Sequence, residues 1–311
     1  MSLSSSPTGP VRPPAIAGTF YPADPGVLAQ RIDDLLRAGG DDGGRPGGRA
    51  GGPSGGATGG APVGLIVPHA GIAYSGTVAA AGWAALRTDP PESVVIAGTN
   101  HLAAGLRGIA VWPDGAWRTP LGDTLIDAGL AARIIALGPP FAADRVSHLA
   151  EHSIEIHLPF LTRACPSSRL VPLLVSCPSL PDCVAAGQAL GRLLAEVRSG
   201  GSSVALVAST DFAHYPHEGL AREVNRRLIP LIERLDPEAV AAEEDALRRS
   251  RLPGLSCGLC GLEPVLLVLA ALRAMGLRSG ELLAEATSAD VPGGDPFRTV
   301  GYAAIAFRAA A

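Results

Sequence analysis

The fold is decided by two stretches, Gly64-Leu65-Ile66-Val67-Pro68-His69-Ala70-Gly71 and Ser93-Val94-Val95-Ile96-Ala97-Gly98-Thr99-Asn100-His101. Each is a continuous apolar run that ends in a polar turn carrying a histidine. Such runs are typical of strands buried on both faces, as in a sheet covered by helices. Ligands of open α/β sheets bind beyond the carboxyl ends of the strands. The sequence therefore predicts that His69 and His101 converge on a metal ion or a polar substrate.

Outward from these stretches, predicted strands and helices alternate. A helix is expected to begin at Asp24, an N-cap that is followed by Pro25 at the first helical position. Further helices are expected at 75–87, 123–137, 152–163, 181–198, 218–250 and 260–275, and strands at 108–111, 170–175, 203–208, 281–287 and 299–307. Pro172 inside one of these strands favours a sheet edge or a strand start. The alternation predicts a single α/β domain with a central mixed, largely buried sheet flanked by helices.

Two segments depart from this alternation. Residues 1–14 are polar and Pro-rich, and we expect a flexible N-terminal arm there, followed by the α/β domain at 15–311. Residues 39–62 are Gly-rich and carry no hydrophobic pattern, so they are predicted to form a disordered insertion.

The composition narrows the class of protein. Of the 311 residues, 47% are hydrophobic and 17% charged, which is enough for a large core. The net charge of −4 gives no electrostatic footprint for nucleic acid. No apolar run approaches the roughly 18 residues that a membrane span needs. The start of the chain lacks the pattern of a signal peptide, and the odd count of five cysteines is typical of reduced thiols, so a cytoplasmic protein is expected.

A third histidine occupies the same kind of position as the first two. Ser209-Thr210-Asp211-Phe212-Ala213-His214 follows the predicted strand at 203–208. A lone histidine is more often structural than functional, but three at successive strand ends indicate a shared site. Asp211 either orients His214 and lines this site or caps the loop that follows.

The segment Glu151-His152-Ser153-Ile154-Glu155-Ile156-His157 is rich in polar groups. On a helix, residues four apart share a face, and a carboxylate near the start suits the helix dipole. The segment therefore either brings Glu151 and His152 to the site or forms a capped amphipathic helix with its polar residues in water. Its spacing does not match the two histidines of a zinc-protease helix.

The cysteines offer a further ligand. Cys257-Gly258-Leu259-Cys260 is a single Cys-x-x-Cys without a second pair, so a structural zinc site is not indicated. A thiol in the loop before a helix can serve as a ligand or nucleophile. The alternative is a pair of small buried residues. The chain contains no Gly-x-Ser-x-Gly elbow, which argues against an α/β hydrolase.

These features belong to eight longer motifs that follow one another along the chain. They are RPPAIAGTFY at 12–21, PHAGIAYSG at 68–76, GTNH at 98–101, TPLG at 119–122, EHSIEIHLPF at 151–160, STDFAHY at 209–215, CGLEP at 260–264 and VGYAA at 300–304. In sequence and order they resemble the Memo family, whose prokaryotic members are known as AmmeMemoRadiSam system protein B. The resemblance extends over about residues 12–307.

This resemblance implies a fold similar to class III extradiol dioxygenases, in which two histidines and a carboxylate hold iron(II). The equivalent Memo pocket has two histidines and a cysteine, which correspond here to His69, His101 and Cys260. Asp211 and His214 match its remaining polar pair.

Three features of the sequence bear on how closely its pocket matches that of the Memo family. Ile72 and Leu102 depart from the family pattern at the pocket rim and bear on substrate choice. Cys257 leaves a second thiol as a competing ligand. Glu263 is a candidate for the carboxylate of the dioxygenases.

The function implied is metal-dependent redox or dioxygenase-like chemistry on an unknown small substrate. Imidazole and thiolate favour iron or copper, with zinc as a further candidate. His214 is suited to proton transfer, with Asp211, Glu151 and His152 as further catalytic candidates. The alternative is a non-catalytic module that uses the same pocket to bind a peptide or its sister proteins, a radical-SAM protein and an AMMECR1-domain protein.

Overall fold

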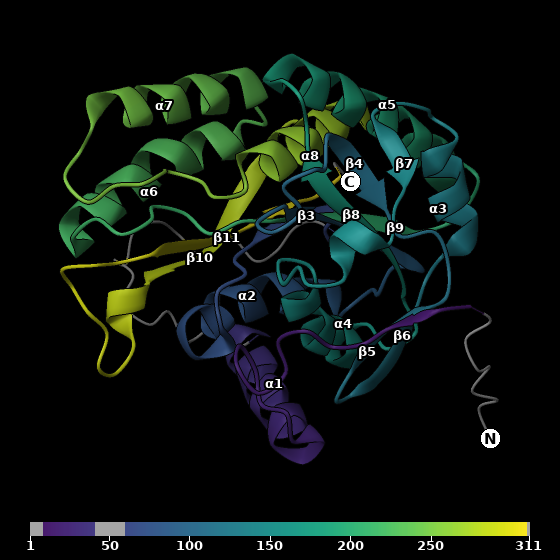
Figure 1. Ribbon diagram of the computed structural model, residues 1–311, viewed down its shortest axis with the longest axis horizontal. Helices are drawn as coiled ribbons and strands as arrows, with labels where there is room; N and C mark the ends of the chain where they lie inside the picture. The colour runs from purple at the N-terminus through teal and green to yellow at the C-terminus, as the bar shows by residue number, and fades with distance from the viewer. Residues whose placement is uncertain (1–8, 41–59, 310–311) are drawn as a thin grey trace.

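An eight-stranded mixed sheet runs through the protein, whose computed structural model describes residues 9–40 and 60–309 (Figure 1). The strand order is β10-β11-β2-β9-β3-β8-β4-β7. The strands are β2 (Gly64–Val67), β3 (Ser93–Thr99), β4 (Gly108–Val111), β7 (Phe141–Ala143), β8 (Arg169–Ser176), β9 (Val204–Ser209), β10 (Gly280–Thr287) and β11 (Gly301–Phe307). The four middle strands are parallel, whereas β11 and β4 run antiparallel to them. The carboxyl ends of β2, β9, β3 and β8 therefore meet at one edge.

Helices cover both faces of the sheet, as the continuous apolar strands predict. They are α1 (Pro25–Gly40), α2 (Ile72–Leu86), α3 (Ala128–Ile135), α4 (Leu158–Ala164), α5 (Leu180–Ser199), α6 (Glu218–Glu233), α7 (Pro237–Ser250) and α8 (Leu262–Ala274). In Figure 1, α5 to α8 lie above the sheet, and α1, α2 and α4 lie below it. No helix in the described ranges is both long and apolar enough to cross a membrane. The predicted single α/β domain with a central mixed sheet is confirmed.

Several local predictions are also confirmed. The first helix begins after Asp24, whose carboxylate accepts a hydrogen bond from the backbone N–H of Val27 at 2.8 Å. Strands β2, β3 and β9 are buried along their whole length. The region 218–250 is helical, as expected, and is divided into two helices, α6 and α7.

Pro172 does not mark a sheet edge or a strand start, and that prediction is wrong. It lies inside β8, between β3 and β4. The carbonyl of Pro172 accepts from the N–H of Trp112, just past the end of β4. Because the N and C=O of one strand residue point the same way, the missing N–H faces a place where β4 has already ended. An interior strand therefore tolerates this proline.

Two predicted helices start later than expected. Residues 122–125 form strand β6 (Gly122–Leu125), and α3 begins only after Asp127, which caps it through the N–H of Leu130 at 2.9 Å. In the second case, η2 (Glu155–His157), a single 3-10 turn, precedes α4. There the side chain of Glu151 accepts from the N–H of Ser153, which competes with a helical start.

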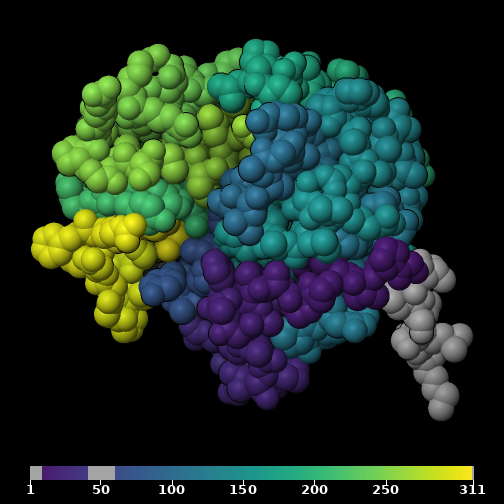
Figure 2. Space-filling view, viewed as in Figure 1, coloured from purple at the N-terminus to yellow at the C-terminus, as the bar shows by residue number. Residues whose placement is uncertain are grey.

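A small second sheet was not predicted. It joins β1 (Val11–Arg12), β5 (Ala116–Thr119) and β6. Because β1 pairs in this sheet, the expectation of a flexible arm is wrong for Val11 and Arg12. In Figure 2 the N-terminal segment, purple, lies across the surface of later parts of the chain. Residues 1–8 of the predicted arm, and 41–59 of the predicted insertion, lie outside the described residues.

His148 is buried near this second sheet and stays neutral. Burial lowers its pKa to about 4, from an ordinary value of 6.5, while its Nε2 lies 3.0 Å from the carbonyl of Ala110. The unfolded chain binds a proton below pH 6.5, whereas the folded protein does not until about pH 4. The free energy of unfolding is therefore expected to fall as the pH drops through this window, by up to about 1.4 kcal/mol per pH unit.

Urea unfolding at pH 7 and pH 5 would measure this loss. His148→Gln keeps a donor for Ala110 but cannot titrate, so its free energy of unfolding should fall less than that of the natural protein. An equal fall in both would show that His148 is not responsible.

Candidate metal centre

Three loops that follow neighbouring strands carry polar side chains at the same position. His69 lies two residues after β2, Asp211 two after β9 and His101 two after β3. Since β9 lies between β2 and β3 and all three are parallel, these side chains reach one edge of the sheet. Cys260 joins them from the loop that precedes α8. Donor atoms of His69, His101 and Cys260 all lie within 4.8 Å of one another.

The hydroxyl of Ser209 fixes the proton of His69. Ser209 Oγ donates its only hydrogen to the carbonyl of Ser153 at 2.6 Å. It must therefore accept from His69 Nδ1 at 2.8 Å and from His157 Nε2 at 2.9 Å. With its proton on Nδ1, His69 keeps a lone pair on Nε2, and this atom faces Cys260 Sγ at 3.3 Å.

The carboxylate of Glu151 determines which ring nitrogen of His101 carries the proton. Its Oε1 lies 3.0 Å from His101 Nδ1 and 3.1 Å from His152 Nδ1, and backbone N–H groups of His101, His152 and Ser153 donate to the same carboxylate. Burial raises the pKa of Glu151, but the hydrogen bonds from His101 and His152 outweigh it and hold this pKa well below its usual range. An ionised carboxylate can only accept, so both rings carry their protons on Nδ1 and leave Nε2 free.

Cys260 is held against His69 and the end of β9. Its Sγ accepts from the backbone N–H of Asp211 at 3.3 Å. Burial, with the nearby charge of Asp211, raises the pKa of the Cys260 thiol well above its usual range. Burial likewise lowers the pKa of His69, so this imidazole is neutral. Without a metal, the thiol proton points to the lone pair of His69, and a cation that binds the thiolate must displace that proton.

Asp211 and His214 lie beside this cluster. Together with Cys260 they form a second group whose donor atoms are within 4.8 Å of one another. Asp211 Oδ1 accepts from the backbone N–H of His69 at 2.8 Å, which joins two strand-end loops rather than capping its own. His214 Nδ1 lies 2.8 Å from the carbonyl of Phe212, which leaves Nε2 of this ring free as well.

The other candidates lie elsewhere. Cys257 belongs to none of these groups, and burial raises its pKa to about 11. Glu263 is also outside them and lines a neighbouring pocket instead. The alternative of a polar face in water at 151–157 is wrong, because Glu151, Glu155 and His157 are all buried.

Sequence reasoning missed Ser209 as the contact of His69 and His157 as the second ring held by the same hydroxyl. Both lie within the motifs at 209–215 and 151–160, but nothing in their spacing shows that they meet at one hydroxyl. His157 is fully buried and keeps Nδ1 without a partner among the described residues.

The donor set fits a first-row transition metal. Two imidazoles and a thiol suit iron, copper or zinc, whereas a site for calcium or magnesium would need mostly oxygen ligands. Hydrogen bonds to the far nitrogen of each imidazole are the usual support of metal-binding histidines. His69 is 2% exposed but the side chain of His101 is 29% exposed, so the cluster is open to solvent on the His101 side.

Ser209→Ala is expected to weaken metal binding about tenfold or more, because His69 loses the contact that fixes its tautomer and its orientation. The measurement is the metal dissociation constant by chelator competition, together with the ¹⁵N shifts of the His69 ring, which report the tautomer. Ser199→Ala, at an exposed serine, is the matched control. An unchanged dissociation constant in Ser209→Ala would contradict this role.

The fold and the site together define an α/β protein with a metal-compatible cluster at the carboxyl edge of its sheet. Over residues 12–306 the sequence matches the family model described as Memo-like protein. The chain belongs to this family, as its motifs indicated.

Relatives of this family cover nearly the whole chain. The sequence is 36% identical over 299 residues to a MEMO1 family protein of Methanopyrus kandleri, which covers 96% of this chain and 99% of the relative. It is 34% identical over 294 residues to one of Methanothermobacter thermautotrophicus, covering 94% and 99%. It is also 34% identical over 299 residues to a MEMO1 family protein of Thermotoga maritima, covering 94% and 97%.

Proposed function

We propose that the protein holds iron or copper with His69, His101 and Cys260 and uses it for redox or dioxygenase-like chemistry on a small substrate. The observation that supports this most is the convergence of two Nε2 lone pairs and one thiol within 4.8 Å. When bound, the metal would supply electron transfer and Lewis acidity. Three protein ligands leave coordination positions for water, oxygen or substrate. The similarity to class III extradiol dioxygenases that the Memo resemblance implies supports oxygen chemistry in this proposal.

The surrounding residues have separate roles in this proposal. His214 exchanges a proton with the bound substrate through its free Nε2, since its Nδ1 is held by the Phe212 carbonyl. Asp211 holds the His69 loop through Oδ1, and its Oδ2 lies 4.0 Å from His69 Nε2. Glu151 orients His101 rather than touching substrate.

His152 lines the approach to the cluster. Its ring stacks on that of His101, with centroids 4.6 Å apart and an angle of 26° between the planes. The centroid of the Phe20 ring also lies 4.8 Å from that of His152. His152 is therefore placed to orient a substrate as it reaches the centre.

Elemental analysis of protein purified without chelator tests the proposal. Natural protein is expected to contain close to one iron or copper per chain. His69→Ala, His101→Ala and Cys260→Ala are each expected to lose it. His217→Asn is the control, because it removes an imidazole that caps α6, outside the centre, and retains an oxygen for that cap.

Full metal content in all three ligand variants would overturn the proposed site. Zinc as the only metal would keep the ligand set but contradict redox chemistry. Metal-free natural protein that captures a radical-SAM or AMMECR1-domain protein would favour the binding-module alternative.

A further inference from the structure

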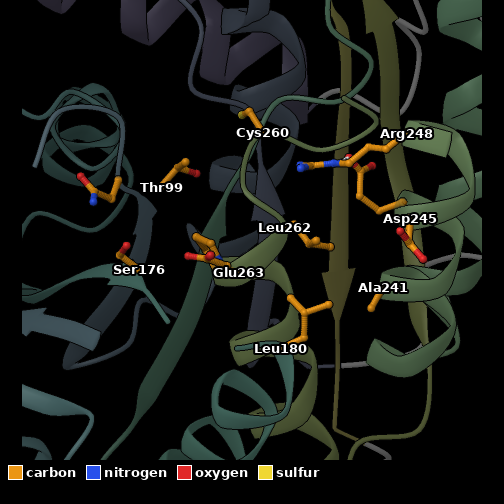
Figure 3. A pocket seen from close by; sticks show the side chains of 12 residues that line it. Thr99, Ser176, Leu180, Ala241, Asp245, Arg248, Cys260, Leu262 and Glu263 are labelled. Carbon is orange, nitrogen blue, oxygen red and sulfur yellow. Dashed lines mark hydrogen bonds and ion pairs between the residues drawn. The ribbon is translucent and has the colours of Figure 1, made fainter. Parts of the chain in front are cut away.

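A pocket of about 410 Å³ adjoins the centre along the carboxyl edge of the sheet (Figure 3). Its walls come from the ends of β3 and β8, the starts of α5 and α8, and one face of α7. Of the three proposed metal ligands only Cys260 lines it, so an occupant would reach the centre from the thiol side. The volume lies within the usual range for small-molecule sites.

One wall of this pocket carries a carboxylate without a cationic partner. Glu263, in the first turn of α8, accepts at Oε2 from the N–H of Cys177 at 3.2 Å. It forms no ion pair within the described ranges. Burial raises its pKa, while the Cys177 N–H and, more weakly, the charge of Arg248 lower it. Arg248 is therefore near enough for its charge to lower the pKa of Glu263, but the two side chains form no ion pair.

The opposite wall carries a guanidinium that uses only one of its nitrogen atoms in a hydrogen bond to the described residues. Arg248 Nε donates to the buried carboxylate of Glu244 at 2.8 Å, and this contact anchors the side chain from α7. Neither Nη atom of Arg248 has a hydrogen-bond partner among the described residues. Glu244 is otherwise satisfied by the N–H groups of Gly258 and Leu259. Figure 3 shows Arg248 and Glu263 approaching the pocket from different elements.

The rest of the lining is mixed, because Thr99, Asn100 and Ser176 contribute polar groups beside the aliphatic residues. Leu180, Ala241 and Leu262 contribute an aliphatic patch to the same pocket. Asp245, the last charged lining residue, is an exposed carboxylate paired with Arg249. The pocket thus presents one unpaired anion, one guanidinium with free N–H groups, and an aliphatic patch.

We propose that this pocket binds a free α-amino acid with an apolar side chain, with its ammonium on Glu263 and its carboxylate on Arg248. A ligand with both charges satisfies both walls, whereas an amine alone or an acid alone satisfies only one. The apolar side chain covers Leu180, Ala241 and Leu262. The inference rests on the proposed function for its role, since it identifies the substrate class, but the binding itself does not require a metal.

Calorimetric titration of the metal-stripped full chain with three matched probes tests this assignment. L-phenylalanine carries both charges, 2-phenylethylamine lacks the carboxylate, and 3-phenylpropanoate lacks the ammonium. L-phenylalanine is expected to bind at least tenfold more tightly than either analogue. Failure of L-phenylalanine to bind, or equal binding of all three probes, would overturn the proposal.

Substitutions at Glu263 and Arg248 should separate recognition of the ammonium group from recognition of the carboxylate. Glu263→Gln keeps an oxygen for the Cys177 N–H and is expected to weaken L-phenylalanine and 2-phenylethylamine about tenfold while leaving 3-phenylpropanoate unchanged. Arg248→Gln should weaken L-phenylalanine and 3-phenylpropanoate and spare the amine, and Arg248→Lys should restore part of the loss. Glu281→Gln, at an exposed carboxylate that does not line the pocket, is the control and should change none of the three. Equal effects on every probe would contradict the assigned contacts.

The two proposals can fail independently. Amino-acid binding in protein that never contains a metal would support the pocket and contradict the metal centre. Metal binding without selective amino-acid binding would support the metal centre and contradict the proposed ligand of the pocket.

Discussion

Replacing Glu151 with glutamine is expected to lower the affinity of the proposed site for a metal about 10- to 100-fold. The carboxylate is 1% exposed and accepts hydrogen bonds from the ring of His101 and from the backbone of His101 and His152, and it lies 3.1 Å from Nδ1 of His152. Glutamine offers one acceptor oxygen, and its NH₂ group would meet N–H donors. His101 then loses both its fixed orientation and the negative charge that supports its Nδ1 proton.

Competition with a chelator of known affinity measures this change. Glu281→Gln is the control, since Glu281 is exposed and its ion pair with Arg308 is long, at 3.8 Å. The melting temperature of each metal-free variant separates lost coordination from lost folding. A folded Glu151→Gln protein with unchanged metal affinity would contradict the role of Glu151.

Arg12→Met is expected to lower the free energy of unfolding by about 3–5 kcal/mol, the usual cost of leaving a buried charge without its partner. Arg12 Nη1 donates to Glu155 Oε2 at 2.6 Å, and both side chains are 0% exposed. The guanidinium also donates to the carbonyls of His148 and Glu151, and it stacks on Trp117 at 4.2 Å. Methionine fills the space but makes none of these polar contacts.

Chemical denaturation compares this variant with two others. Arg37→Met breaks an exposed ion pair with Asp34 and should cost about 1 kcal/mol or less. Arg12→Met combined with Glu155→Gln should be more stable than Arg12→Met alone, because the buried charge is gone. A double variant that is less stable than the single one would show that the unpaired carboxylate is not the cause.

The fold was largely predictable because burial on both faces leaves a direct trace in sequence. β2, β3 and β9 are unbroken apolar runs, and such short runs are typical of strands in a sheet that is covered on both faces. β1, β5 and β6 were not predictable, since each is at most four residues long and mixes polar with apolar side chains. β1 also pairs with β5 across about 100 positions, and its Arg12 contacts Glu155, 143 positions away.

The candidate site was predictable where it follows strand ends. His69, His101 and Asp211 could be placed together because strands in one sheet end at one edge. The contacts that orient them were not predictable. Glu151 approaches His101 from a non-helical turn, and Ser209 meets His69 from the last residue of β9. Such contacts depend on tertiary packing rather than on local periodicity.

The position of β9 between β2 and β3 determines when the site can first exist. The two histidine-bearing strands are separated by about 30 residues in sequence, yet they are not adjacent in the sheet. A nascent chain that has reached His101 therefore has no site, and it acquires the correct spacing only when residues beyond 204 arrive. The thiol comes later still, at position 260 of 311. A metal at the proposed site would accordingly meet all three ligands only after most of the polypeptide has been synthesised.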